Sequence, residues 1–203
     1  MNNVNEINHR RRAFLQKLSH TLGSAAALSV ATGSGISVAF AYTPRADSAN
    51  NPGLLFSQMQ MQILSDICAT ILPTTTTKSA ADVDCHGFVD HQLVQCHSEQ
   101  QQKICIDAVS LVSENAQSAY GDVFSNINEK QRIKVLEDIE ARTSATREQK
   151  EQFSFLKSLI VFGYFTSEEG ITKATNFQPY PGGFKGSIPV TADTKVWGSL
   201  NYY

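Results

Sequence analysis

The sequence predicts a mainly α-helical fold, with a compact domain of about five helices and an extended, irregular, aromatic-rich C-terminal tail. Two observations support this prediction. From residue 57 to residue 165, apolar side chains recur every three or four positions, which is the repeat of a helix that buries one face. From residue 166 onward this repeat is absent, and proline, glycine and aromatic residues are frequent, which is typical of irregular structure.

The first helix is expected to begin after Ser57, because Gln60 stands three residues later and the two side chains can form a capping box. Pro73 should end this helix, since proline has no N–H to donate to the next helical hydrogen bond. Its predicted buried stripe consists of Met59, Ile63, Leu64, Ile67, Cys68, Ile71 and Leu72.

A second helix is predicted from Gly87 to Cys96, and a third should begin at Ser98, with Gln101 in the capping-box position. Gly121 is a natural stop for the third helix, because glycine readily adopts the left-handed conformation that ends many helices. The side chains expected to face inward from these two helices are Phe88, Val89, Leu93, Cys96, Ile104, Cys105, Ala108, Val109, Leu111 and Val112.

A fourth helix is expected to start near Asn128 and to bury Ile133, Leu136 and Ile139. A fifth is expected to run from about Glu148 to Tyr164. The fifth helix should bury Phe153, Leu156, Leu159, Ile160 and Phe162.

The C-terminal tail is unusually aromatic. Nine of the chain's 18 aromatic residues lie in its last 42 positions. Disordered segments are depleted in aromatic residues, so the tail is expected to bury its rings. Two arrangements remain open, and both can hold at once. The tail can wrap over the helices of its own domain, or part of it can lie on another subunit, since Tyr, Trp and Phe are enriched at protein interfaces.

The N-terminal residues have the form of a twin-arginine export signal. Arg11 and Arg12, followed by Phe14 and Leu15, fit the pattern that is read by the machinery for moving folded proteins across a bacterial membrane. An ordinary secretory signal or a membrane anchor is the alternative interpretation.

An uncharged stretch, residues 18–41, follows these basic residues and ends with Ala39 and Ala41 in an A-x-A cleavage pattern. Its length could span a bilayer, but it is rich in Gly, Ser, Thr and Ala and is therefore only weakly apolar. We predict four segments in the chain. They are a signal peptide over 1–41, a flexible leader over 42–56, the helical domain over 57–165 and the tail over 166–203.

The predicted mature chain is mildly acidic. Residues 1–41 hold four of the 17 Lys and Arg and one of the 19 Asp and Glu, which leaves 13 basic against 18 acidic residues. These charges are scattered along the chain. Nucleic-acid binding needs clustered cations, so a nucleic-acid partner is not expected.

Four cysteines, Cys68, Cys85, Cys96 and Cys105, follow the predicted signal, and an even number in an exported chain suggests disulfides. If one helix holds both Cys85 and Cys96, they stand about 16 Å apart, which is too far for a bond. The remaining pairings are Cys68–Cys85 with Cys96–Cys105, or Cys68–Cys96 with Cys85–Cys105. Buried free thiols and a bridge to a partner chain also stay open.

The Cys-His pairs at 85–86 and 96–97, together with His91, raise the possibility of a metal site, because zinc favours Cys and His ligands. However, no C-x₂-C or H-x₃-H spacing links them, and C-x-x-C-H for covalent haem is absent. Motifs for nucleotides, flavins and serine hydrolases are also absent. We therefore assign no catalytic, cofactor-binding or metal-binding residue to this chain.

Four segments carry a resemblance to a known family. Residues 63–77, ILSDICATILPTTTT, are similar to its first helix and Thr-rich turn, and residues 87–93, GFVDHQL, to its second helix. Residues 162–170, FGYFTSEEG, resemble its most specific signature, and residues 178–190, QPYPGGFKGSIPV, its Pro-Gly loop. On these segments the chain resembles the gluconate 2-dehydrogenase subunit 3 family, the small subunits of bacterial FAD-dependent sugar and sugar-acid dehydrogenases.

The resemblance implies a non-catalytic accessory subunit. In that family, a large flavoprotein of the glucose-methanol-choline oxidoreductase type oxidises the sugar, and a cytochrome c subunit often accepts the electrons. The small subunit supplies the export signal and escorts its folded partner. The resemblance thus implies no cofactor in this chain, FAD in the large partner and, in some complexes, haem c in a third subunit. It also implies a periplasmic location, with membrane association through the complex.

The partner interface is expected to lie in the signature segment and the aromatic tail, because these aromatic residues stand outside the predicted helical stripes. The alternative function is a stand-alone periplasmic module that binds a metal or haem through its Cys and His residues. The candidate interface residues are Tyr164, Phe165, Thr166, Ser167, Glu168, Tyr180, Phe184 and Trp197.

Overall fold

The structure is a computed structural model of the 203-residue chain, and it describes residues 42–177, 187, 189–192, 194 and 195. The chain divides into two units, Met1–Ala41 and Tyr42–Tyr203. The first unit lies outside the described residues, so the fold below is that of the second.

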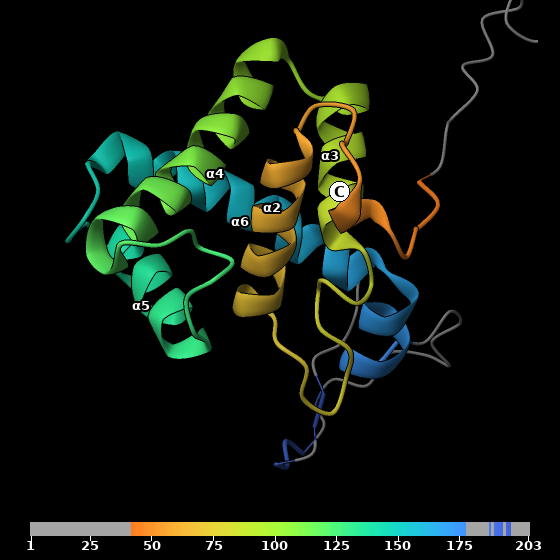
Figure 1. The fold of residues 1–203 in the computed structure, drawn as a ribbon. Coiled ribbons are helices and arrows are strands. Elements are labelled where there is room, and N and C mark those ends of the chain that lie inside the picture. Colours follow the sequence, from red (N-terminus) through yellow and green to blue (C-terminus); the bar gives the residue numbers. More distant parts are fainter. Residues whose placement is uncertain (1–41, 178–186, 188, 193, 196–203) are drawn as a thin grey trace, which may run out of the picture. The chain divides into compact units, whose positions relative to one another are not determined.

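The described residues form a helical fold without a β-strand, which confirms the predicted fold class (Figure 1). A short 3₁₀-helix, η1, precedes five α-helices, and a π-helical turn, η2, follows them. In chain order they are η1 (Ser48–Asn50), α2 (Gln58–Ile71), α3 (Cys85–Cys96), α4 (Glu99–Tyr120), α5 (Glu129–Glu140), α6 (Arg147–Thr166) and η2 (Gly170–Ala174).

The helix ends follow from local side chains. Capping boxes start α2 at Ser57 and α4 at Ser98, as the sequence predicts, and similar boxes start α5 and α6. Gly121 ends α4 in the left-handed conformation, with φ 73°. Helix α3 begins two residues before the predicted Gly87, because the Asp84 side chain accepts a hydrogen bond from the Gly87 N–H and caps an earlier turn.

The core lies where α6 packs against α4 and α3 and where α2 packs against α3, α4 and α5. Its largest fully buried side chains include Phe153, Leu156 and Ile160 on α6. The face of α6 that carries them is the predicted one. A continuous apolar stripe along a helix is therefore a reliable guide to burial in this chain.

Four side chains that the sequence predicts as buried are exposed: Met59 by 72%, Phe162 by 51%, Ile133 by 39%, and Cys96. Met59 lies in the first turn of α2, at the rim of the core. On α5, side chains three residues apart point in directions that differ by about 60° around the helix axis. Ile133 is six residues before the buried Ile139, so the two side chains point about 120° apart. Phe162 stands about 160° round α6 from Ile160, beyond the buried stripe.

The segment predicted as a flexible leader, residues 42–56, instead packs on the helices. Its η1 helix contacts α2 and α3, and the side chains of Ser48 and Phe56 are each 1% exposed. In Figure 1 this segment, coloured orange, folds back over α2 and α3 before α2 begins. Burial of these two side chains and the hydrogen bonds described below hold the segment in place.

Among the described helices, none combines the length and the apolar character that crossing a membrane requires.

Candidate functional site

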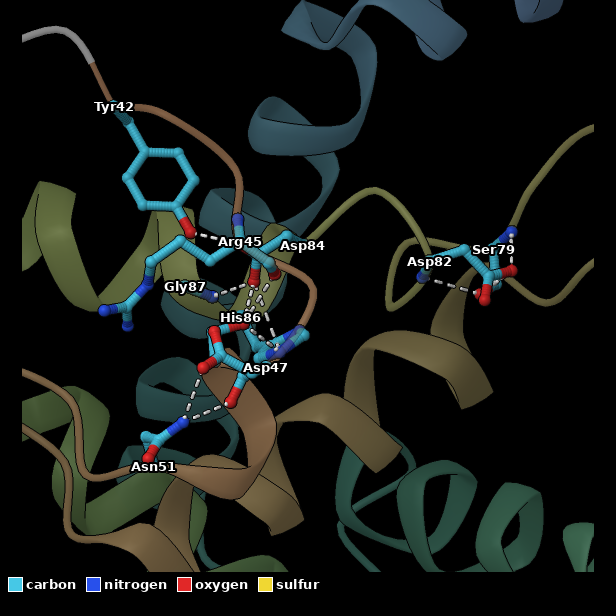
Figure 2. A network of polar contacts seen from close by, with 10 residues as sticks. Tyr42, Arg45, Asp47, Asn51, Ser79, Asp82, Asp84, His86 and Gly87 are labelled. Atoms are coloured by element: carbon cyan, nitrogen blue, oxygen red, sulfur yellow. Dashed lines mark hydrogen bonds and ion pairs between the residues drawn. The ribbon is translucent and has the colours of Figure 1, made fainter.

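Two buried aspartates of the α3 region hold the leader on the domain. The first, Asp84, is 4% exposed and caps α3 in a left-handed conformation, with φ 60°. It accepts hydrogen bonds from the hydroxyl groups of Tyr42 and Ser48 and from the Arg45 N–H at 2.6 Å (Figure 2). Hydrogen bonds to an ionised carboxylate are stronger than neutral ones, so this contact fixes the start of the leader.

The second, Asp90, lies in the middle of α3 and is also 4% exposed. Its carboxylate accepts the backbone N–H groups of Leu54 at 2.6 Å, Leu55 at 2.9 Å and Phe56 at 3.1 Å. A Cβ atom at Gly53 would lie 2.4 Å from an Asp90 oxygen, so only glycine allows the chain to pass so close. We call Asp84 and Asp90, with the leader groups that they bind, the leader clamp.

Ser48, His86 and Asp84 are the residue types of a hydrolytic triad, but their geometry differs from that of a catalytic triad. The Ser48 hydroxyl lies 2.8 Å from His86 Nε2, and an Asp84 oxygen lies 3.3 Å from the same nitrogen. In a triad, serine and aspartate contact opposite nitrogens of the imidazole. His86 Nδ1 has no hydrogen-bond partner among the described residues. Burial lowers the pKa of His86 despite the nearby Asp84 and Asp66, so the group braces the leader as a neutral ring.

The signature segment, residues 163–170, forms the end of α6 and the start of η2. The predicted interface residue Tyr164 is only 4% exposed, and its hydroxyl donates to Thr77 Oγ1 at 2.9 Å and to the Lys78 carbonyl at 3.0 Å. Glu169 accepts the Lys78 N–H at 3.1 Å. These contacts tie α6 to the Thr-rich turn, so half of the signature stabilises the fold.

The other half of the signature faces solvent. Phe165 is 40% exposed and Glu168 is exposed. Thr166 and Ser167 are partly buried, and their hydroxyls bond back to carbonyls of α6. Phe162, which the sequence predicts as buried, is more exposed than Phe165. Three further interface candidates, Tyr180, Phe184 and Trp197, lie outside the described residues.

An aromatic row leads from the leader to Phe162. The ring of Tyr42 lies 5.5 Å from that of His91 and 6.0 Å from that of Phe88, and Phe88 lies 6.1 Å from Phe162. These separations are typical of favourable aromatic pairs. Beside the row lies a groove of about 450 Å³. We call it the aromatic groove; it is lined by Tyr42, Pro44, Val83, Cys85, Phe88, Gln92, Phe162, Gly163, Thr166 and Ser167.

The four cysteines are free thiols in this structure, so neither predicted disulfide pairing is present. Cys68, Cys85 and Cys105 are at most 1% exposed and belong to the hydrophobic core, where a thiol packs as a small apolar group. Cys96, which the sequence places on the buried face of its helix, is exposed. Burial raises the pKa of Cys85 and of Cys105 to about 12, and it raises that of Cys68 well above its usual value.

Native thiol labelling at pH 8 should therefore modify one cysteine per chain, Cys96, and unfolding should release all four. A thiol with a pKa of about 12 is ionised to roughly one part in 10⁴ at pH 8, and only the thiolate reacts. Mass spectrometry of the labelled chain gives both counts. The Cys96→Ser variant should show no native labelling. Two labels after unfolding, in place of four, would reveal a disulfide and contradict this result.

The Cys and His residues that the structure describes do not converge on a metal site. Within the part of the chain that the structure describes, no group of three or more His, Cys, Asp or Glu side chains could hold a metal ion. Cys85 and Cys96 begin and end α3, so helix geometry separates them by about 16 Å. His86 lies beside the leader clamp, with its Nε2 2.8 Å from the Ser48 hydroxyl, and His97 Nδ1 lies 3.2 Å from the Gln92 carbonyl.

The described residues define a helical protein whose buried polar groups brace its own structure and whose exposed Phe162 lines one groove. A family model for gluconate 2-dehydrogenase subunit 3 matches residues 58–182, from the first residue of α2 to beyond η2. The chain belongs to this family, whose name indicates an accessory subunit of a dehydrogenase complex. No curated protein and no solved structure matches the chain.

Proposed function

We propose that this chain is the non-catalytic small subunit of a periplasmic FAD-dependent dehydrogenase that acts on a sugar, a sugar acid or a polyol. The observation that carries the proposal is the family match over residues 58–182, which spans all five α-helices. The large partner, a flavoprotein of the glucose-methanol-choline type, holds FAD and oxidises the substrate. A further subunit with haem c receives the electrons in complexes that contain one.

The small subunit also acts as an escort for export. Arg11, Arg12, Phe14 and Leu15 form the twin-arginine signal, which serves proteins that cross the membrane already folded. This route suits a flavoprotein, because FAD binds to the folded protein before export. After export, the signal is removed behind Ala41, and the complex associates with the membrane. All of these signal residues lie outside the described residues.

The aromatic groove and the rings beside it are the proposed contact surface for the flavoprotein. Exposed Phe162 and Phe165 lie near one end of α6, where large apolar side chains stand in water at a cost that a partner removes. Glu168 adds a charge at the rim of this surface. Thr166 and Ser167 line the groove itself. Tyr180, Phe184 and Trp197 are proposed to belong to the same surface.

Purification of the tagged full chain from its own cells should recover a large protein with the absorption spectrum of FAD. The Phe162→Ser, Phe165→Ser double variant should recover at least about tenfold less flavoprotein, because buried aromatic anchors dominate binding energies. The matched control is Tyr120→Ser, which removes a ring of similar exposure, 37%, at the end of α4.

Two outcomes would contradict the proposal. A chain that purifies without any flavoprotein would not be a dehydrogenase subunit. A haem absorption band or one bound metal ion per chain, in the protein purified alone, would favour the stand-alone binding module instead.

A further inference from the structure

We propose that the Asp84 part of the leader clamp delays removal of the signal peptide, because it holds the first residues behind the cleavage site against α3. This inference rests on the proposed function, since it takes residues 1–41 as an export signal that is cut after Ala41. It adds a role for described residues that the export hypothesis alone does not give them: Tyr42, Arg45, Ser48 and Asp84.

Tyr42 is the first residue behind the predicted cleavage site, and it is held from two sides. Its hydroxyl donates to Asp84, and its ring packs at 6.0 Å from Phe88 and 5.5 Å from His91. The third residue further on, Arg45, donates its N–H to the same carboxylate at 2.6 Å. The clamp thus begins directly at the bond to be cut.

The start of α3 leaves space for this contact. A Cβ atom at Gly87 would lie 2.1 Å from the Tyr42 hydroxyl and 2.6 Å from an Asp84 oxygen. Only glycine therefore permits the helix, the tyrosine and the carboxylate to meet. Ser48, 1% exposed, adds a second hydroxyl to the carboxylate and ties the next turn of the leader to the same point.

A peptidase must bind the residues on both sides of the scissile bond as an extended strand. Clamped residues cannot enter its cleft until they leave the domain. For such a segment, the cleavage rate follows the population of the locally opened state when opening and closing are fast. When the leader opens, the buried Asp84 carboxylate loses three hydrogen-bond donors. This loss costs free energy, so the population of the opened state is small.

Slow cleavage affects how long an escort subunit keeps its signal peptide. The signal stays attached to the chain while the domain is folded and the leader is closed. The time of cleavage is then set by opening of the leader. It is not set by transport of the chain across the membrane alone.

The test uses the full-length chain in complex with its flavoprotein, treated with purified signal peptidase in detergent micelles. Asp84→Asn and Tyr42→Phe should each be cut about tenfold faster than the unchanged chain, because each weakens hydrogen bonding to a charged group. Asp90→Asn is the matched control. It loosens residues 54–56, twelve or more positions from the scissile bond, and should change the rate less than about twofold.

Synthetic peptides of residues 36–47, with Tyr or Phe at position 42, give the rate without the clamp. Both peptides should be cut after Ala41, and faster than the folded chain. Equal rates for the folded chain, its Asp84→Asn variant and the peptide would overturn the inference. Peptides that resist cleavage would overturn it as well, because Ala41 would then not be the cleavage site. Neither result would affect the proposed export of the complex, which depends on Arg11 and Arg12 and is measured separately by cell fractionation.

Discussion

Cells that carry the Arg11→Lys, Arg12→Lys double variant should retain the flavoprotein partner in the cytoplasm and lose periplasmic dehydrogenase activity by at least about tenfold. Under the proposed function, residues 1–41 are an address for the export machinery, and the arginine pair itself is the recognised feature. Lysine keeps the positive charges but lacks the planar guanidinium group with its five donors. Because the partner is proposed to be exported by means of the signal of this chain, both proteins should be affected together.

Cell fractionation with an assay for FAD-dependent dye reduction measures this effect. The matched control is Arg10→Lys, which makes the same chemical change at the neighbouring position, outside the pair. It should leave periplasmic activity within about twofold of the unchanged strain. Normal periplasmic levels of the flavoprotein in the double variant would refute the escort role, while leaving a role as a structural subunit intact.

Gly170→Ala should lower the free energy of unfolding by about 3 kcal/mol, because the added methyl group has no space. Its Cβ would lie 2.0 Å from the Tyr164 carbonyl oxygen and 2.9 Å from Phe165 Cα, and both are backbone atoms of α6. That backbone cannot easily move away, since the Tyr164 hydroxyl is bound to Thr77 and Lys78. Gly170 is itself buried.

Thermal unfolding of the full chain, followed by circular dichroism, should show a Tm about 6–12 °C lower for Gly170→Ala. Gly121→Asn is the control, because no atom lies within 4 Å of a Cβ at that position and asparagine tolerates its positive φ of 73°. It should cost less than about 1 kcal/mol. A Gly170→Ala protein as stable as this control would show that α6 and η2 are not packed as closely as described.

The helices were largely predictable because their signals are local. A capping box such as Ser57 with Gln60 joins residues three positions apart, and the structure contains it as predicted. Gly121 ends α4 because its own backbone adopts the left-handed conformation. Burial was less predictable, since it depends on a neighbouring helix. Ile133 and Phe162 are as apolar as their buried neighbours, but among the described residues their side chains stay exposed.

The candidate site was predictable only in part. The signature segment was found in the sequence, but its residues do different things. Tyr164 points into the fold and Phe165 points out of it, and the ring of Phe162 belongs to the exposed set. A motif shows that residues belong together, and burial alone decides which of them can meet a partner. The disulfide prediction depended on even numbers of cysteine, whereas the thiols of Cys68 and Cys105 pack as core side chains.

The sequence by itself determined the helical class, most helix ends and the family resemblance, because each of these depends on residues that are close together in the chain. The tertiary structure alone decided that the leader is held and not free. Its contacts join Tyr42 to Asp84 across 42 positions and Leu54 to Asp90 across 36. No local sequence pattern predicts such a pairing, because a buried carboxylate is stabilised by whichever hydrogen-bond donors the fold brings to it.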